Sequence, residues 1–129
     1  MVFNTHFDHV GVQARNNSAK LIIEKTHEYN KEKAPVVLMG DFNLTDEKEA
    51  IKFISENLND AKQAAEKVIF GPEGTFSGFK FDQPLTQRID YIFTDKEKIK
   101  VLKYAVLSDS KDMKYYSDHL PVYIEVDLN

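Results

Sequence analysis

Acidic, imidazole and amide side chains follow apolar stretches at four places in this chain. The four segments are Asn4-Thr5-His6, Gly40-Asp41-Phe42-Asn43, Arg88-Ile89-Asp90-Tyr91 and Ser117-Asp118-His119-Leu120. Carboxylates can hold a divalent cation, an imidazole can take a proton from water near neutral pH, and amides can donate to phosphoryl oxygens. Side chains of these types, placed in this way, predict one phosphate-hydrolysing site that is scattered through the sequence.

The segment around Gly40 comes directly after an apolar run, residues 36–39. Glycine permits close approach of backbone or ligand. Asp41 can hold a divalent ion or a water molecule, and Asn43 can donate its amide to a phosphoryl oxygen. Taken alone, the segment is also compatible with an ordinary turn, because Gly, Asp and Asn are common turn formers.

The segment before the last apolar stretch offers a general base. His119 can take a proton from water, provided that a carboxylate holds its other ring nitrogen. Asp90 is the best candidate for that carboxylate, because it alternates with bulky neighbours and points away from them. Asp118 can bind a metal ion. The alternative is a loop Asp-His pair that precedes Pro121.

Three residues near the start, His6, Asp8 and His9, raise the alternative of a zinc-dependent hydrolase. Zinc needs three or four ligands in a tetrahedral array. His6 and Asp8 share a face of the predicted strand, whereas His9 follows the strand's end. A phosphate-contacting role for His6 therefore fits better, with a structural strand histidine as the other interpretation.

Composition limits the class of protein. The chain has 129 residues, 42% of them hydrophobic, which predicts one compact domain over residues 1–129. Cysteine is absent, so disulfides and thiolate chemistry are excluded. The net charge of −4 disfavours a long polyanion clamped on a basic stripe. With neither a signal peptide nor a membrane span in the pattern, we expect a soluble chain of undecided compartment.

Hydrophobic periodicity predicts strands and helices in mixed order. The expected helix over 13–30 turns one side inward, formed by Ala19, Ile22, Ile23, Thr26 and Tyr29. A second helix is expected to start near Asp46, which forms a capping box with Glu49. The remaining expected elements are strands at 2–7, 35–40, 87–94, 99–107 and 121–128, a short helix at 60–67 and a surface loop at 71–86. Strands 87–94 and 99–107 are expected to pair as a hairpin, in a layered α/β or α+β fold.

Together, the four segments resemble the motifs of the endonuclease/exonuclease/phosphatase family, which has the deoxyribonuclease-I-like fold. The matching segments are Asn4 to His6, Gly40 to Asn43, Arg88 to Phe93 and Ser117 to Val122, in the family's order. The resemblance implies a metal-dependent phosphohydrolase, such as a phosphodiesterase, nuclease or phosphatase.

The resemblance also implies a role for each residue. His119 would activate the attacking water and Asp90 would orient its imidazole. Asp41 and Asn43 would position the nucleophile and stabilise the transition state, with Asn43 also binding phosphate. His6 would contact the scissile phosphate or act as an acid. A further expectation is Mg²⁺ or Mn²⁺ held by Asp118 and Asp41.

The family's domains are twice as long as this chain, which resembles only their C-terminal half. The N-terminal half of the family carries the glutamate that is the principal metal ligand, so the resemblance implies weak or absent metal binding and negligible hydrolysis by this chain alone. It also implies half of a four-layer α/β/β/α sandwich, a mixed sheet with helices on one face. We expect the exposed apolar face to drive self-association into a homo-oligomer. A non-catalytic, self-associating α/β module is the alternative function.

The resemblance leaves the substrate open among nucleic acids, phospholipids and inositol phosphates. The segment 71–86, which contains Phe76, Phe79, Lys80 and Phe81, is expected to border the site and to influence this choice. Its aromatic residues suit a base or a lipid, whereas the acidic composition disfavours long duplex DNA.

Overall fold

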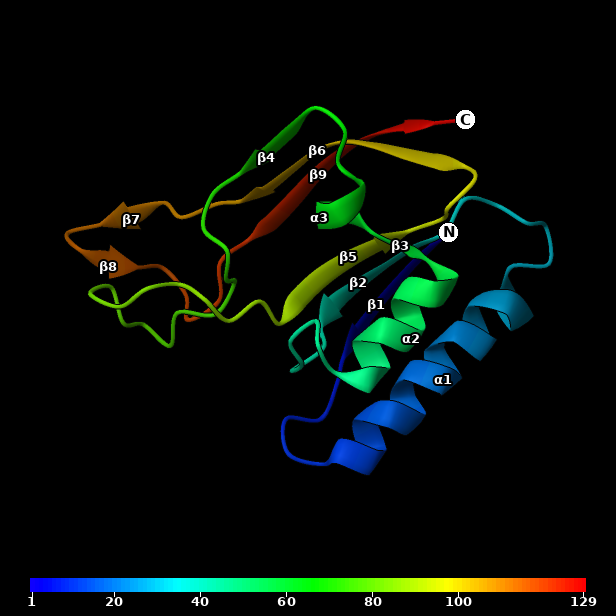
Figure 1. Cartoon of the computed structure of the whole chain (residues 1–129), viewed down its shortest axis with the longest axis horizontal. Coiled ribbons are helices and arrows are strands. Elements are labelled where there is room, and N and C mark those ends of the chain that lie inside the picture. Colours follow the sequence, from blue (N-terminus) through cyan, green and yellow to red (C-terminus); the bar gives the residue numbers. More distant parts are fainter.

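The computed structural model describes residues 1–129 as mixed α/β (Figure 1). The helices are α1 (Val12–Tyr29), α2 (Glu49–Asn57) and α3 (Ala61–Ala64). The strands are β1 (Val2–His6), β2 (Val37–Asp41), β3 (Asn59–Asp60), β4 (Val68–Phe70), β5 (Asp90–Thr94), β6 (Ile99–Val106), β7 (Ser110–Lys111), β8 (Lys114–Tyr115) and β9 (Val122–Leu128). None of the helices provides a membrane crossing, and the longest, α1, carries charged residues along its 18-residue length.

Strands β1, β2, β5 and β3 form one sheet in that order, in which β1 and β2 are parallel and β5 is antiparallel to β2. Helices α1 and α2 lie together on one face of it (Figure 1). Alternation in the strands explains the arrangement, because inward residues such as Leu38, Tyr91 and Phe93 are buried beneath the helices. The prediction of a mixed sheet with helices on one face is confirmed for this part of the fold.

A second sheet contains β4, β6 and β9, and β7 with β8 forms a separate hairpin. The predicted hairpin between strands 87–94 and 99–107 is therefore wrong, because β6 pairs with β4 and β9 rather than with β5. The C-terminal end of β5 has no free edge for β6, because it pairs with β2 on one side and with β3 on the other. Asp95 stabilises the intervening turn by accepting from the amides of Glu97 and Lys98.

Two details of the helices differ from expectation. Helix α2 begins at Glu49, and its N-cap residue, Lys48, makes no side-chain cap. Asp46 instead lies 3.5 Å from the Arg88 guanidinium, so the predicted capping box is wrong. Helix α1 buries Ala19, Ile23 and Thr26 as predicted, but Tyr29, the last residue of the helix, is 60% exposed.

Gly40 fixes the spacing between β1 and β2 close to the predicted site. Its φ is +147°, and a Cβ at this position would lie 1.8 Å from the carbonyl oxygen of Thr5. A side chain would therefore force the two parallel strands apart. The close approach predicted for this glycine is to backbone, and it keeps His6 and Asp41 on neighbouring strands in register.

Candidate active site

The predicted site residues gather where β1 and β2 end and where β5 and β9 begin (Figure 1). Strand pairing explains why, because His6 is opposite Asp41, and Asp41 is opposite Asp90, across three neighbouring strands. His119 comes just before β9, in a segment that bridges to Phe76. Motifs from the first and last parts of the chain, those of His6 and His119, are thereby brought to one edge of the sheet.

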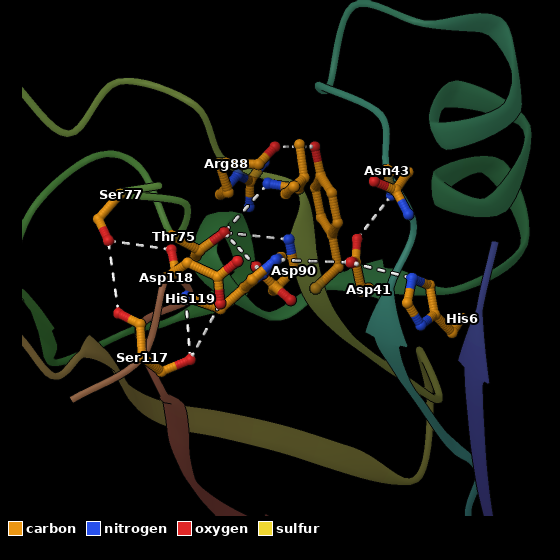
Figure 2. Close-up of polar contacts among 12 residues, drawn as sticks. His6, Asp41, Asn43, Thr75, Ser77, Arg88, Asp90, Ser117, Asp118 and His119 are labelled. Atoms are coloured by element: carbon orange, nitrogen blue, oxygen red, sulfur yellow. Dashed lines mark hydrogen bonds and ion pairs between the residues drawn. The ribbon is translucent and has the colours of Figure 1, made fainter. Parts of the chain in front are cut away.

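His119 and Asp90 form a hydrogen-bonded pair, with Nδ1 of the imidazole 2.9 Å from Oδ2 of the carboxylate (Figure 2). A carboxylate at this distance favours the tautomer with its proton on Nδ1, which leaves Nε2 with a free lone pair. The two side chains are 30% and 19% exposed, so water can reach the imidazole while the pair is partly shielded. The structure therefore places the predicted base and its predicted partner in contact.

Burial and charge act on this pair in opposite ways. Burial, the largest single influence on His119, lowers its pKa, but the hydrogen bond and charge of Asp90, with the charge of Asp41, outweigh it and raise the pKa above 6.5. Burial raises the pKa of Asp90 above its usual value, and the hydrogen bonds from Thr75 and His119 offset only part of this effect. A raised imidazole pKa makes His119 a stronger base near neutral pH.

Asp41 lies between the two histidines (Figure 2). Its Oδ2 is 3.4 Å from Nε2 of His6 and 3.8 Å from Nε2 of His119. Its Oδ1 accepts the backbone amide of Asn43 at 2.8 Å, which fixes the carboxylate in the turn after β2. The carboxylate is 15% exposed and faces the same space as both imidazoles.

Asn43 is held in a turn with φ of +51°, a left-handed conformation that asparagine tolerates better than most residues. Its side-chain amide donates to the carbonyl oxygen of Phe7 at 2.9 Å, and its own carbonyl accepts from Arg15 at 3.1 Å. These bonds tie the turn after β2 to the segment after β1. One N–H of the side-chain amide remains available for a ligand.

Asp118 is placed differently from the other predicted residues. Its backbone carbonyl accepts the amides of Ser77 and Gly78, at 2.7 and 3.2 Å. Its carboxylate accepts only the neighbouring hydroxyl of Ser117, at 3.3 Å. The carboxylate is not part of the group that could hold a metal ion, so the metal-binding role of Asp118 stays a prediction.

A divalent cation fits part of this donor set. Asp41, Asp90 and His119 each offer one ligand atom, and these atoms lie within 4.8 Å of one another. Carboxylate oxygens suit Mg²⁺ or Mn²⁺, and Mg²⁺ keeps several waters when few protein ligands are present. Because Oδ2 of Asp90 already accepts two hydrogen bonds, Asp41 offers the freest carboxylate.

The alternative zinc site is not supported by the geometry. Asp8 accepts the amides of Val10 and Gly11 at 2.6 and 2.8 Å, which orders the turn before α1. None of His6, Asp8 and His9 belongs to a group of potential metal ligands. His6 instead lies at the predicted site, with Nε2 3.4 Å from Oδ2 of Asp41.

Thr75 is a site residue that sequence reasoning missed. Its hydroxyl donates to Oδ2 of Asp90 at 2.6 Å and accepts the backbone amides of Ile89 and Asp90 at 3.1 Å each (Figure 2). Thr75 is fully buried and Ser77 is 8% exposed, so the segment 71–86 is not simply the surface loop that was predicted. A threonine in a glycine- and proline-rich segment carries no signal that distinguishes it from a turn residue.

Arg88 also acts within the structure, although the sequence suggested no role for it. Its guanidinium forms two parallel hydrogen bonds with Asp60, at 2.9 and 2.7 Å, and both residues are 5% exposed. Burial lowers the pKa of Arg88, but the bonds and charge of Asp60 raise it overall, so the guanidinium remains charged. The pair stabilises the segment at the start of β5. The Arg88 guanidinium carbon also lies 4.4 Å from the centroid of the Tyr91 ring.

Known proteins include sequences and solved structures that are similar to this chain. The sequence profile of the endonuclease/exonuclease/phosphatase family matches residues 4–119. A search of curated proteins found no match.

Solved structures that resemble the chain include a functionally unknown conserved protein from Enterococcus faecalis V583, 34% identical with a TM-score of 0.88, over 99% of this chain and 50% of that one. A mannosyl-6-phosphatase from Bacteroides thetaiotaomicron VPI-5482 is 32% identical, with a TM-score of 0.89, over 98% and 50%. A family protein from Bacteroides thetaiotaomicron is 32% identical, with a TM-score of 0.90, over 97% and 47%. The chain thus spans about half the length of these proteins, has the deoxyribonuclease-I-like fold over that half, and belongs to the endonuclease/exonuclease/phosphatase family of phosphoric ester hydrolases.

Proposed function

We propose that this chain carries the water-activating part of a phosphate-ester hydrolase. The observation that supports this most is the 2.9 Å contact between His119 Nδ1 and Asp90 Oδ2, which leaves Nε2 facing the space beside Asp41. In the proposed mechanism, Nε2 takes a proton from the water that attacks phosphorus. Asp90 orients the imidazole and stabilises its protonated form.

The remaining residues would position the phosphate. His6 contributes an imidazole whose Nε2 lies 3.4 Å from Asp41, on the rim where a phosphoryl oxygen would sit. Asn43 offers the free N–H of its side-chain amide to a second oxygen. Phosphoryl transfer depends mainly on such positioning and on neutralising charge on the oxygens.

Magnesium or manganese would be held chiefly by Asp41, with the carboxylate of Asp90 close to it. Asp118, the other ligand that the sequence predicts, lies outside this group. When bound, such an ion neutralises negative charge on the phosphoryl oxygens. Without one, the carboxylates of Asp41 and Asp90 would repel an incoming phosphate. We therefore propose a metal-dependent activity.

We further propose that residues 1–129 alone hydrolyse esters slowly. The potential metal group contains only two carboxylates, and that of Asp90 is committed to Thr75 and His119. A cation held chiefly by one carboxylate binds weakly, because Mg²⁺ sites usually combine protein carboxylates with substrate phosphates.

For the substrate, we propose the phosphate ester of a small hydrophilic alcohol rather than a nucleic acid. A relative that is 32% identical over 98% of this chain is a mannosyl-6-phosphatase. The net charge of −4 supports the same choice, because nucleic-acid grooves are usually basic. The broader classes of phosphodiesters and inositol phosphates are the substrates to compare.

The test is phosphate release from glucose 6-phosphate in Mg²⁺ or Mn²⁺, with the chain at high concentration. His119→Ala should lower the rate about 10²- to 10⁴-fold if the imidazole is the general base. His27→Ala is the matched control, since His27 is an exposed histidine on α1, away from the site. A measurable rate that is equal in His119→Ala and the unmodified chain would refute the mechanism, and so would a failure of phosphate to perturb the NMR resonances of His6, Asn43 and His119.

A further inference from the structure

A cavity of about 320 Å³ adjoins His119 and Asn43. Its walls come from the first turn of α1, from the turn between β2 and α2, and from the segment that precedes β5. The residues that matter for recognition are Arg15, Thr45, Lys48, Phe76 and Gln87. Its volume is at the lower end of the range for small-molecule sites, about 300–1,000 Å³.

Most of the polar groups on these walls are hydrogen-bond donors. Arg15 donates to the carbonyl oxygens of His9 and Asn43, at 3.3 and 3.1 Å, and forms no ion pair with a carboxylate. Its Nε is buried and has no partner. Lys48 lies 3.1 Å from Glu47, so its charge is partly balanced. The cavity therefore favours a ligand rich in oxygen acceptors without demanding a second full negative charge.

Two further groups can adjust to a ligand that both donates and accepts. The carboxamide of Gln87 forms no hydrogen bond within the protein, although the backbone carbonyl of Gln87 accepts the amides of Thr75 and Phe76. The Thr45 hydroxyl donates to Glu47 at 2.7 Å and keeps its lone pairs free. Hydroxyl groups, which donate and accept, match this mixture.

Phe76 supplies the apolar surface of the cavity. Its ring meets the His119 imidazole edge to face, with centroids 5.0 Å apart. The ring is half-buried and engaged by the imidazole, so it offers no broad platform of the kind on which nucleobases stack. An acyl chain would strip water from Arg15 and Gln87 without replacing their hydrogen bonds.

We propose that this cavity is the subsite for the organic group of the substrate, and that it fits a compact polyhydroxylated ring such as the hexose of a sugar phosphate. This inference rests on the proposed function, because the phosphate must sit against His119 and Asn43. Hydroxyl groups of the ring bond to Gln87, Thr45 and the cationic side chains, and its C–H face packs on Phe76. The subsite, rather than the catalytic pair, then selects the alcohol.

The experiment compares inorganic phosphate with glucose 6-phosphate, each titrated into the full chain in Mg²⁺ and followed by amide NMR. Glucose 6-phosphate should shift the resonances of Thr45 and Gln87, whereas phosphate should shift only those around Asn43 and His119. Gln87→Leu should weaken glucose 6-phosphate binding about five- to ten-fold, the loss of a hydrogen bond or two, and leave phosphate affinity unchanged. Gln83→Leu is the matched control, because Gln83 lies in the same segment but outside this cavity.

Two outcomes would overturn the proposal, and they differ in what else they affect. If both probes bind equally and Gln87→Leu changes neither affinity, the subsite is wrong while the phosphate site stands. If neither probe binds, the proposed function fails and the subsite fails with it. The comparison of resonance shifts uses only the unmodified chain. It therefore still tests the subsite if Gln87→Leu fails to fold.

Discussion

Replacing Thr75 with valine tests whether a buried hydroxyl holds the catalytic pair in place. Valine has nearly the same shape, so the change removes the hydroxyl without opening a cavity. Three hydrogen bonds disappear, one to the Asp90 carboxylate and two from the backbone amides of Ile89 and Asp90. At a fully buried position, water cannot replace all of them.

The expected cost follows from these contacts. A buried donor left without a partner costs about 1–3 kcal/mol, and bonds to charged groups are stronger than neutral ones. Because the half-buried Asp90 carboxylate can recover some hydration, we expect Thr75→Val to lower the free energy of unfolding by about 2–4 kcal/mol. That is a large share of the total for a domain, about 5–15 kcal/mol.

Urea unfolding followed by circular dichroism measures this loss. With a urea slope of about 2 kcal/mol per molar, the midpoint should fall by about 1–2 M. Thr75→Ser is the control, since it keeps the hydroxyl and loses one methyl group, worth about 1 kcal/mol. The Asp90 pKa should rise further in Thr75→Val, because the Thr75 hydrogen bond now lowers it.

Two results would refute this reasoning about Thr75. One is a Thr75→Val variant as stable as the unmodified chain, which would mean that the amides of Ile89 and Asp90 find other partners. The other is a loss of stability in Thr75→Ser equal to that in Thr75→Val, which would assign the effect to packing rather than to hydrogen bonding.

Three more predictions concern the buried ion pair, the imidazole and the sheet face opposite the helices. Arg88→Met should lower the free energy of unfolding by about 3–5 kcal/mol, since it leaves the Asp60 carboxylate buried without its partner. Calorimetry should show that the double variant Arg88→Met/Asp60→Leu recovers part of this loss. No recovery would contradict the explanation. In metal-free buffer, NMR titration should give His119 a pKa above 6.5 that falls in Asp90→Asn. Since that pKa is raised in the folded state, its contribution to stability is complete below about pH 6.5 and is lost as pH rises through the folded value; an unchanged pKa in Asp90→Asn would count against the pair. Self-association through the face of the first sheet opposite α1 and α2 stays a prediction, and light scattering at micromolar concentration would contradict it by showing a monomer. Met39→Glu should weaken such an association, because Met39 alternates with the buried Leu38 on β2 and therefore lies on that face.

The sequence predicted the parts of the fold whose signals are local. Strand β9 alternates over seven residues, and the inward face of α1 was found at Ala19, Ile23 and Thr26. Each of these patterns depends on the residues of one element, so it can be read without knowing what the element packs against. His119 and Asp90 were chosen from their motifs: Asp90 alternates with bulky neighbours at the start of β5, and His119 precedes β9.

The features that were missed depend on partners far away in the sequence. Strand β4 is only three residues long and exposed, and it exists because it pairs with β6 in parallel. The β7–β8 hairpin is similarly short and exposed. The wrong hairpin between β5 and β6 has the same origin, since two adjacent strands pair only when a free edge is available.

The sequence predicted the reactive residues of the site but not the contacts that hold them in place. Asp60 and Arg88 form their ion pair across 28 residues, and nothing near Asp60 in the sequence indicates a buried carboxylate. Asp118 was predicted as a metal ligand from its motif, yet the backbone of this residue makes the clearer contacts. A motif specifies which residue types are present, whereas the direction of each side chain depends on the turns around it.

The contacts around Thr75 indicate that the base strength of His119 and the metal affinity of the site depend on different residues. The segment that carries Thr75 is bound to the segment that carries His119 by backbone hydrogen bonds, Leu120 to Thr75 at 2.7 Å and Ser77 to Asp118 at 2.7 Å. The Thr75 hydroxyl also donates to Asp90, so the pair of His119 and Asp90 and the threonine that supports it all lie within this chain. The imidazole–carboxylate pair therefore forms whenever these residues fold, whereas the metal group has one freely available carboxylate, that of Asp41. It follows that the raised pKa of His119 should persist in a chain that binds Mg²⁺ poorly, and that base strength and metal affinity can be measured as independent quantities in residues 1–129.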